Sequence, residues 1–377
     1  MNKGKIEIGI AGVGWIATNA HIPALLNNEN VTIKAVYDTC FERAEKVYSQ
    51  FGIKQAFQEF QPFLECGLDG VIIATPNYTH VSYSKAALEH KVSVLCEKPT
   101  AFKAEEVEEI KNLAKNNGVF YMPGLVNRWR QDIQTIHKLI LNGQLGQLKE
   151  VSGGWIRKFG VPRPGTWFTN RNCSGGGVLT DLGSHVIDIC SSFLGSESSV
   201  EEYQLTTSRC NEEMLKDRGA ASWFQRDEEK EFELDVEDTA VARIKFSDGK
   251  KMNVNLSWLA PVKADCTYFK LRGTKGQAIL KTLFGFSNER LWEKDTLEYE
   301  SNGVKKVMTF QPDDNHSRCA FQQMLSYYVN ALIEGKTGFH DFSISYMTVS
   351  IIENLYREEI VDGVNCYHDL TEELELE

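Results

Sequence analysis

Two separated groups of residues carry side chains that suit proton transfer. Lys98 stands in Glu97-Lys98-Pro99, and Asp181 and His185 are four residues apart in a glycine-rich stretch. On a helix, residues i and i+4 share one face, so Asp181 can orient His185 and stabilise its charged form. An imidazole suits removal of the hydroxyl proton that accompanies hydride loss from an alcohol carbon.

By itself, an Asp-x-x-x-His spacing is more typical of a buried structural pair than of a catalytic one. A metal site is a further alternative for these side chains. No third ligand with useful spacing accompanies Asp181 and His185, so we expect no metal.

A glycine turn near the start of the chain indicates that the protein binds a dinucleotide. Gly12-x-Gly14-x-x-Ala17 follows an apolar segment and precedes a helical one. Gly12 permits the tight turn, Gly14 lets the backbone approach a pyrophosphate, and Ala17 allows close packing of helix against strand. The N–H groups at the start of that helix would face the pyrophosphate.

An acidic residue at the end of the second predicted strand bears on whether the protein binds NAD or NADP. Asp38 ends the second apolar segment, 24 residues beyond Gly14. Its oxygens can accept hydrogen bonds from the adenosine ribose hydroxyls, and its charge would repel a 2′-phosphate. We therefore expect NAD rather than NADP, although Arg43 nearby weakens the preference.

Short apolar segments alternate with helical segments over the first third of the chain, and this alternation predicts a parallel sheet with helices on both faces. We expect a Rossmann NAD-binding domain over residues 1–123. Its predicted strands are residues 5–11, 31–36, 70–74, 92–96 and 119–122, and its predicted helices are a helix up to residue 26 and residues 39–50, 80–89 and 104–116.

The remaining residues, 124–377, are expected to form an α/β domain with an open, mainly antiparallel sheet that serves substrate binding and oligomerisation. Asp248-Gly249 between two apolar segments predicts a hairpin. Met252, Val254, Leu256 and Trp258 alternate with polar residues, which predicts a sheet covered on one side only. The other side would be an oligomer surface, so we expect a homodimer or homotetramer.

Two polar segments end neighbouring strands of the first domain. Thr75-Pro76-Asn77 and Glu97-Lys98-Pro99 both fall at the carboxyl edge of the sheet, where open α/β folds bind ligands. A residue before proline is held extended or in a turn, and a cis bond there would aim Lys98 into the cleft. A lysine desolvated against a cofactor can act in proton transfer.

Residues 75–80, 86–88 and 94–99, read with the glycine-rich stretch 175–188, closely resemble the Gfo/Idh/MocA family of glucose–fructose oxidoreductase and inositol dehydrogenase. The resemblance implies a two-domain nicotinamide-dependent oxidoreductase acting on sugars, cyclitols or their derivatives. It also implies that Lys98, Asp181 and His185 are the catalytic residues.

The expected ligand contacts combine the motifs with this resemblance. Phe168 stands where the family often has arginine after tryptophan, so no arginine contact is expected there. The expected cofactor-binding residues are Gly12, Gly14, Trp15, Ile16, Asp38, Thr75, Asn77, His80, Glu97, Lys98 and Trp167. The expected substrate-binding residues are Lys98, Arg128, Arg171, Asp181 and His185.

A basic segment leads into the predicted site. Residues 128–171 hold eight basic residues against two acids, in a chain of net charge −11. One hypothesis is that part of this segment recognises an anionic group such as a sugar phosphate, a uronate or a nucleotide diphosphate. The alternative is a basic solvated face. The basic residues are Arg128, Arg130, Lys138, Lys149, Arg157, Lys158, Arg163 and Arg171.

Composition narrows the function classes further. The net charge of −11 argues against nucleic-acid and membrane partners, and no apolar run approaches the ~20 residues that cross a bilayer. We expect a cytoplasmic enzyme with reduced cysteines. Three alternatives stay open: a ketosugar reductase in a biosynthetic pathway, a non-catalytic NAD- and sugar-binding regulator, and an enzyme that cleaves glycosidic bonds through transient oxidation.

Overall fold

The computed structural model describes residues 5–162, 165–209, 235–311 and 317–362. Contacts between Cα atoms divide the chain into two compact units. The first unit is Met1–Trp129 with Arg318–Val349, and the second is Arg130–Ser317 with Ser350–Glu377. The return of residues 318–349 to the first unit differs from the expected boundary at residue 123.

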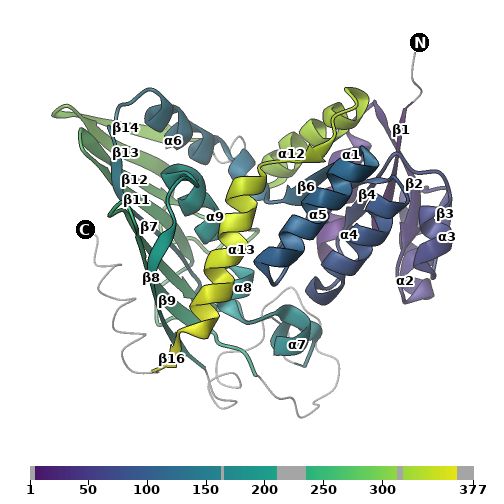
Figure 1. Ribbon diagram of the computed structural model, residues 1–377, viewed down its shortest axis with the longest axis horizontal. Coiled ribbons are helices and arrows are strands. Elements are labelled where there is room, and N and C mark those ends of the chain that lie inside the picture. Colours follow the sequence, from purple (N-terminus) through teal and green to yellow (C-terminus); the bar gives the residue numbers. More distant parts are fainter. Residues whose placement is uncertain (1–4, 163–164, 210–234, 312–316, 363–377) are drawn as a thin grey trace. The chain divides into compact units, whose positions relative to one another are not determined.

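The first unit contains a sheet of seven parallel strands in the order β15-β6-β5-β4-β1-β2-β3 (Figure 1). The chain reverses direction across the sheet between β1 and β4, which is the switch point where doubly wound folds bind ligands. The strands are β1 Ile6–Ala11, β2 Val31–Tyr37, β3 Gln55–Phe57, β4 Gly70–Ile73, β5 Ser93–Glu97, β6 Phe120–Gly124 and β15 Gly338–Phe339.

The helices of the first unit follow the predicted alternation. The helix expected over residues 80–89 is confirmed, and that over 104–116 extends one residue further. The short strand β3 and helix α3 were not predicted. The helices are the π-helical turn Ala17–His21, α1 Ile22–Leu26, α2 Phe41–Phe51, α3 Phe60–Leu64, α4 His80–Glu89, α5 Ala104–Asn117 and α12 Ser317–Ile333, with 3₁₀ turns Asn77–Thr79 and Val126–Trp129. Helix α13, Phe342–Arg357, begins in the first unit, and its residues from Ser350 onward belong to the second.

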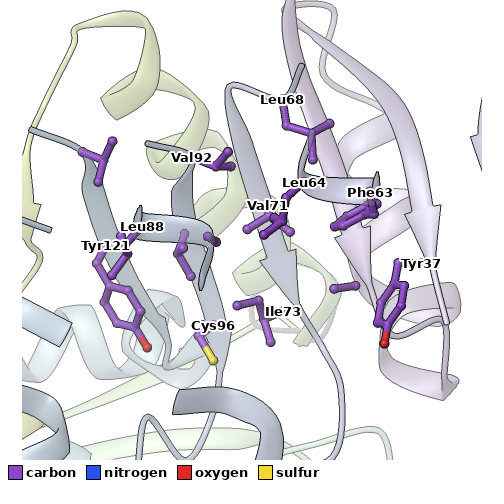
Figure 2. Packing of buried hydrophobic residues seen from close by; sticks show 14 of the residues in the cluster. Tyr37, Phe63, Leu64, Leu68, Val71, Ile73, Leu88, Val92, Cys96 and Tyr121 are labelled. Carbon is purple, nitrogen blue, oxygen red and sulfur yellow. The ribbon is translucent and has the colours of Figure 1, made fainter. Parts of the chain in front are cut away.

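A buried apolar cluster holds this sheet to its helices (Figure 2). Phe63 from α3, Leu88 from α4 and Tyr121 from β6 are fully buried in it. All four residues of β4 are buried, as expected for a parallel strand covered on both faces. The cluster fixes β4 and β5, and their carboxyl ends carry the residues expected to do chemistry.

The second unit contains a nine-stranded sheet in the order β14-β13-β12-β11-β7-β10-β9-β8-β16. The pairs β10·β7 and β16·β8 are parallel and the other pairs are antiparallel, which confirms the predicted sheet type. The strands are β7 Leu148–Ile156, β8 Val200–Ser208, β9 Thr239–Phe246, β10 Lys251–Ser257, β11 Cys266–Gly273, β12 Gly276–Thr282, β13 Asp295–Ser301, β14 Val304–Phe310 and β16 Glu359–Val361.

Helices cover one face of the second sheet. Helix α9 packs on β7 and β10, and the alternating apolar residues of β10 are fully buried. The hairpin predicted at Asp248-Gly249 joins β9 to β10. The helices of this unit are α6 Gln131–Leu141, α7 Arg171–Ser174, α8 Val178–Asp181 and α9 Gly183–Leu194, with a 3₁₀ turn at Trp167–Thr169.

The expectation that the other face is bare is wrong at one end of this sheet. Asn255 and Ser257 point away from the apolar residues of β10, yet both are fully buried. The Asn255 amide donates to the Tyr268 hydroxyl at 2.8 Å, and Tyr268 belongs to a buried apolar cluster against which Leu291 and Trp292 pack. The alternation along β10 predicts which side chains lie on the same face of the sheet. It does not predict whether segments from elsewhere in the chain cover that face.

Candidate functional site

The glycine turn lies between β1 and the π-helical turn, and its two glycines meet different surroundings. Gly12 has φ +84°, and a Cβ atom there would lie 2.6 Å from the backbone oxygen of Ala74. At Gly14 a Cβ atom would meet no atom of the described residues within 4 Å. The fold therefore requires glycine at residue 12, whereas the open space at Gly14 fits the close approach of a pyrophosphate.

This contrast yields a matched pair of variants. Gly12→Ala is expected to lower the free energy of unfolding by about 2–4 kcal/mol, because it adds a left-handed backbone strain and a backbone clash. Gly14→Ala is expected to keep the stability of the cofactor-free protein within about 0.5 kcal/mol and to weaken NAD binding about tenfold or more. Denaturant titration and NAD titration of both variants check this, and equal destabilisation would contradict it.

Asp38 connects the end of β2 to the glycine turn. Its carboxylate accepts the backbone N–H of Val13 at 3.1 Å and that of Cys40 at 3.0 Å. The Arg43 Nε atom lies 3.8 Å from the same carboxylate, on a side chain that is 55% exposed. The structure thus places a buried acid beside the turn, and the exposed guanidinium of Arg43 lies close to that acid.

The segment after β4 is tied to the segment after β5 by one histidine. His80, 1% exposed, has Nε2 2.9 Å from the Thr75 carbonyl oxygen and Nδ1 2.8 Å from the Pro99 carbonyl oxygen. The Thr75 hydroxyl pairs with that of Thr79 at 2.6 Å, and Asn77 is buried in the same turn. The ring nitrogens of His80 thus contact the backbone, and its expected cofactor contact stays a prediction.

Lys98 lies at the carboxyl end of β5, half-buried, and its peptide bond to Pro99 is cis. The Glu97 carboxylate accepts the backbone N–H of Lys98 at 3.2 Å. The same carboxylate pairs with Nε2 of His21 at 2.7 Å, and His21 is fully buried. The expected edge location of Glu97-Lys98-Pro99 is therefore observed within the first unit.

In the second unit, a buried acid holds the glycine-rich stretch that leads into α8. The Glu237 carboxylate accepts the N–H of Gly177 at 3.0 Å and that of Leu179 at 3.1 Å, and the Tyr356 hydroxyl donates to it at 2.7 Å. A Cβ atom at Gly177 would lie 1.9 Å from the Glu237 backbone oxygen. Burial raises the pKa of Glu237, and its hydrogen bonds oppose that shift.

Asp181 ends α8 among aromatic and basic side chains. Trp258 Nε1 donates to its Oδ2 atom at 3.0 Å. Burial lowers the pKa of the Arg157 guanidinium, and the carboxylates of Asp181 and Asp265 oppose that shift. The Arg157 guanidinium lies 4.9 Å from the centre of the Trp155 ring. Asp181 is therefore an acid held in place by an indole N–H and neighbouring a half-buried cation.

His185 lies one turn beyond Asp181, on α9. Its ring is 9% exposed and packs 5.7 Å from that of Trp155. Since Trp155 also contacts Arg157, the structure brings Asp181, His185 and Arg157 into one cluster of the second unit. Lys98 belongs to the first unit.

The expected binding residues Arg128 and Arg171 are engaged in ion pairs. Arg128 contacts Asp341 at 3.0 Å, and Arg171 contacts Glu359 at 2.8 Å while lying over the Tyr356 ring. Trp167 is half-buried and stacks on Phe168 with 3.9 Å between ring centres.

Other members of the basic segment also have acidic partners. Arg130 is buried against Asp132 at 2.9 Å, and Lys158 contacts Glu289 at 3.0 Å. Arg163 lies outside the described residues. Arg157, beside Asp181, is the basic residue of this segment that the structure associates with the predicted site.

Sequence reasoning missed several residues that hold the site. His21, Glu237 and Trp258 contact site residues that are 58–77 positions away in the chain. Arg157 appeared only as one of eight basic residues. No local spacing signals such contacts, and Glu237 stands in an acidic run with Glu233, Asp235 and Asp238, which gives no sign that its side chain is buried.

Among the described residues, no three His, Cys, Asp or Glu side chains lie close enough together to hold a metal ion. No helix within the described ranges has the length and apolar character that crossing a membrane requires.

Two family models match the chain. Residues 6–125 match the model described as "Oxidoreductase family, NAD-binding Rossmann fold", and residues 133–279 match the GFO/IDH/MocA C-terminal domain.

Curated relatives share moderate identity with the chain. It is 29% identical over 288 residues to a protein of Amycolatopsis mediterranei named as the oxidoreductase subunit of a UDP-kanosamine synthase, covering 76% of this chain and 78% of that protein. It is 29% identical to D-glucoside 3-dehydrogenase of Escherichia coli, over 52% of this chain and 56% of that enzyme. It is 32% identical to glucose-6-phosphate 3-dehydrogenase of Bacillus subtilis, over 48% and 52% respectively.

Solved structures share the fold. A 3-ketoreductase from Actinomadura kijaniata, in complex with NADP and TDP-benzene, matches with a TM-score of 0.75 and 17% identity over 95% of this chain and 99% of that chain. GenD2 from gentamicin A biosynthesis, in complex with NAD, matches with a TM-score of 0.73 and 20% identity over 94% of each chain.

Proposed function

Because the chain belongs to the Gfo/Idh/MocA oxidoreductase family, we propose that it transfers a hydride between a nicotinamide cofactor and a secondary alcohol or ketone of a sugar derivative. One observation carries this proposal. Lys98 lies at the carboxyl end of β5, in the same sheet as the glycine turn that follows β1. Lys98 and the glycine turn thus lie at the carboxyl ends of strands of one sheet, the edge at which open α/β folds bind ligands.

The nicotinamide, when bound, accepts a hydride from the alcohol carbon or returns it to the ketone. The chain's own residues handle the proton. In the oxidative direction the uncharged Lys98 amine takes the proton of the reacting hydroxyl, and in the reductive direction the ammonium returns it. Asp181 and His185 bind hydroxyl groups of the sugar and form a second proton-transfer pair.

We further propose that the reacting carbon is C3 of a hexose derivative. The names of two curated relatives specify 3-dehydrogenases, and one structural neighbour is a 3-ketoreductase. These names cover phosphorylated, glycosidic and nucleotide-bearing compounds, so the group attached to the hexose stays open. Arg157, a half-buried cation beside Asp181, is the candidate for contacting an anionic group.

The test is NADH formation from NAD with methyl glucoside, glucose, glucose 6-phosphate, UDP-glucose and myo-inositol. We expect turnover with at least one hexose derivative, and reduction of the product with borodeuteride should place deuterium at C3. Deuterium at another carbon would contradict the C3 assignment. Equal kcat/KM for neutral and phosphorylated forms of one sugar would contradict anion recognition by the basic segment.

For the cofactor we propose NAD rather than NADP. Asp38 is buried beside the glycine turn, where its charge would repel a 2′-phosphate. We expect kcat/KM to favour NAD by about tenfold or more, and Asp38→Ser to reduce that ratio at least about tenfold. Initial rates with both cofactors check this. Arg43→Ala is the comparison variant for Asp38→Ser, because it removes the positive charge next to Asp38. A wild-type preference for NADP would contradict the assignment.

A further inference from the structure

We infer that two buried histidines, His21 and His80, are positioning residues that connect the two cofactor-binding turns to Lys98. His21 lies in the π-helical turn that follows the glycine turn, and His80 begins the helix that follows Thr75-Pro76-Asn77. Both contact the segment Glu97-Lys98-Pro99. The inference rests on the proposed role of Lys98.

His21 acts on Lys98 through a carboxylate. Its Nε2 atom lies 2.7 Å from one oxygen of Glu97, and the other oxygen of Glu97 accepts the Lys98 backbone N–H at 3.2 Å. An ionised carboxylate only accepts hydrogen bonds, so His21 donates its Nε2–H to Glu97. The ring also packs edge-on against Phe321, 5.1 Å between centres, which fixes its orientation.

His80 acts from the other side of Lys98, through the backbone. Both of its ring nitrogens face carbonyl oxygens, of Thr75 at 2.9 Å and of Pro99 at 2.8 Å. A carbonyl oxygen only accepts hydrogen bonds, and a neutral imidazole has a single N–H. Both contacts are hydrogen bonds only when His80 is the doubly protonated imidazolium, so the geometry indicates a buried cation at residue 80.

The surroundings of His80 are consistent with that charge. Burial lowers the pKa of the imidazole, but interactions with Cys96 and with the carbonyls of Pro99 and Thr75 outweigh it and raise the pKa to about 9. Cys96 is the titratable group facing the ring from β5. Tyr121 on β6 is the next titratable group beyond it, and Figure 2 shows these two side chains on neighbouring strands.

The two contacts hold the Lys98 segment at both ends. Glu97 is fixed from the glycine-turn side and Pro99 from the Thr75 side, so each cofactor-binding turn shares one histidine with the segment. Displacing a proton-transfer group by about 1 Å can cost on the order of 10²-fold in rate. The histidines are therefore expected to affect proton transfer more than cofactor affinity.

The experiment compares His80→Gln and His21→Gln with wild type in the full-length chain. We expect each to lower kcat about tenfold or more, and to change the NAD dissociation constant by a much smaller factor. His90→Gln is the matched control, because His90 is exposed at the opposite end of the same helix as His80. Loss of NAD binding in proportion to kcat, or kcat unchanged in both variants, would overturn the inference.

A double-variant cycle separates this inference from the proposed function. If the histidines act through Lys98, adding His80→Gln to Lys98→Ala should change the remaining single-turnover rate by less than about threefold. If His80→Gln lowered the single-turnover rate of Lys98→Ala by the same factor as it lowers the wild-type rate, the inference would be overturned. Unchanged turnover in Lys98→Ala alone would instead refute the proposed role of Lys98.

A spectroscopic readout tests the charge on His80 without any turnover. In protein labelled with ¹⁵N-histidine at neutral pH, both ring nitrogens of His80 should have the shifts of protonated nitrogen, with His80→Gln providing the assignment. One unprotonated ring nitrogen at residue 80 would overturn the imidazolium assignment. It would also remove the hydrogen bond to either Thr75 or Pro99.

Discussion

Replacing Lys98 with alanine is expected to lower kcat by about 10²–10⁴-fold, the range that a positioned acid or base contributes. The methyl group of alanine cannot take up the hydroxyl proton, whereas the backbone N–H that Glu97 accepts is retained. The dissociation constant of NAD should therefore change by less than about threefold. Initial rates of NADH formation and a binding titration on the same preparation measure both quantities.

The control for this variant is Lys46→Ala. Lys46 is exposed on α2, away from the ligand-binding edge, so its removal should leave kcat within about twofold of wild type. Turnover retained in Lys98→Ala would show that another group transfers the proton. His185 would then be the next residue to change.

Asp181→Asn is the second change with a large expected effect, a loss of about 10²-fold in kcat. The amide has nearly the same shape and can still accept the indole N–H of Trp258. It lacks the negative charge that acts on Arg157 and that the proposed mechanism assigns to orienting and charging His185. The loss should appear in kcat more than in thermal stability, and steady-state kinetics with thermal unfolding on the same samples test this.

Trp258→Phe is the comparison for Asp181→Asn. It removes the hydrogen bond to Asp181 and keeps most of the buried ring. If the charge of Asp181 matters for chemistry, the tryptophan variant should lose less than about tenfold in kcat. An equal loss in both variants would assign Asp181 a structural role.

The parts of the fold that could be predicted from the sequence are those set by local pattern. Apolar segments of four to seven residues predicted β1, β2, β4, β5 and β6, because a parallel strand buried on both faces is continuously apolar. The carboxyl-edge location of Lys98 followed from that alternation, since successive parallel strands end on the same side of a sheet. A family resemblance assigned the roles of Asp181 and His185.

The remaining features depend on contacts between distant parts of the chain. His21 meets Glu97 from 76 residues away, and Glu237 meets Gly177 from 60 residues away. Strand β15 is two residues long, too short to produce a pattern of its own. The buried polar face of β10 depends on loops that follow it by tens of residues. Such pairings are fixed by tertiary packing and leave no periodic trace in the sequence.

Residues 318–349 belong to the first unit, but they are synthesised after residues 130–317 of the second unit. Tyr328 donates to the Ser93 carbonyl at 2.8 Å, β15 pairs with β6, and Val349 packs on Ala101 and Val107. A nascent chain that has reached residue 129 holds the whole glycine turn and Lys98 but lacks all three contacts. The cofactor-binding unit is therefore completed only after almost the entire second unit has left the ribosome, and a truncated gene product ending near residue 129 would expose that apolar surface.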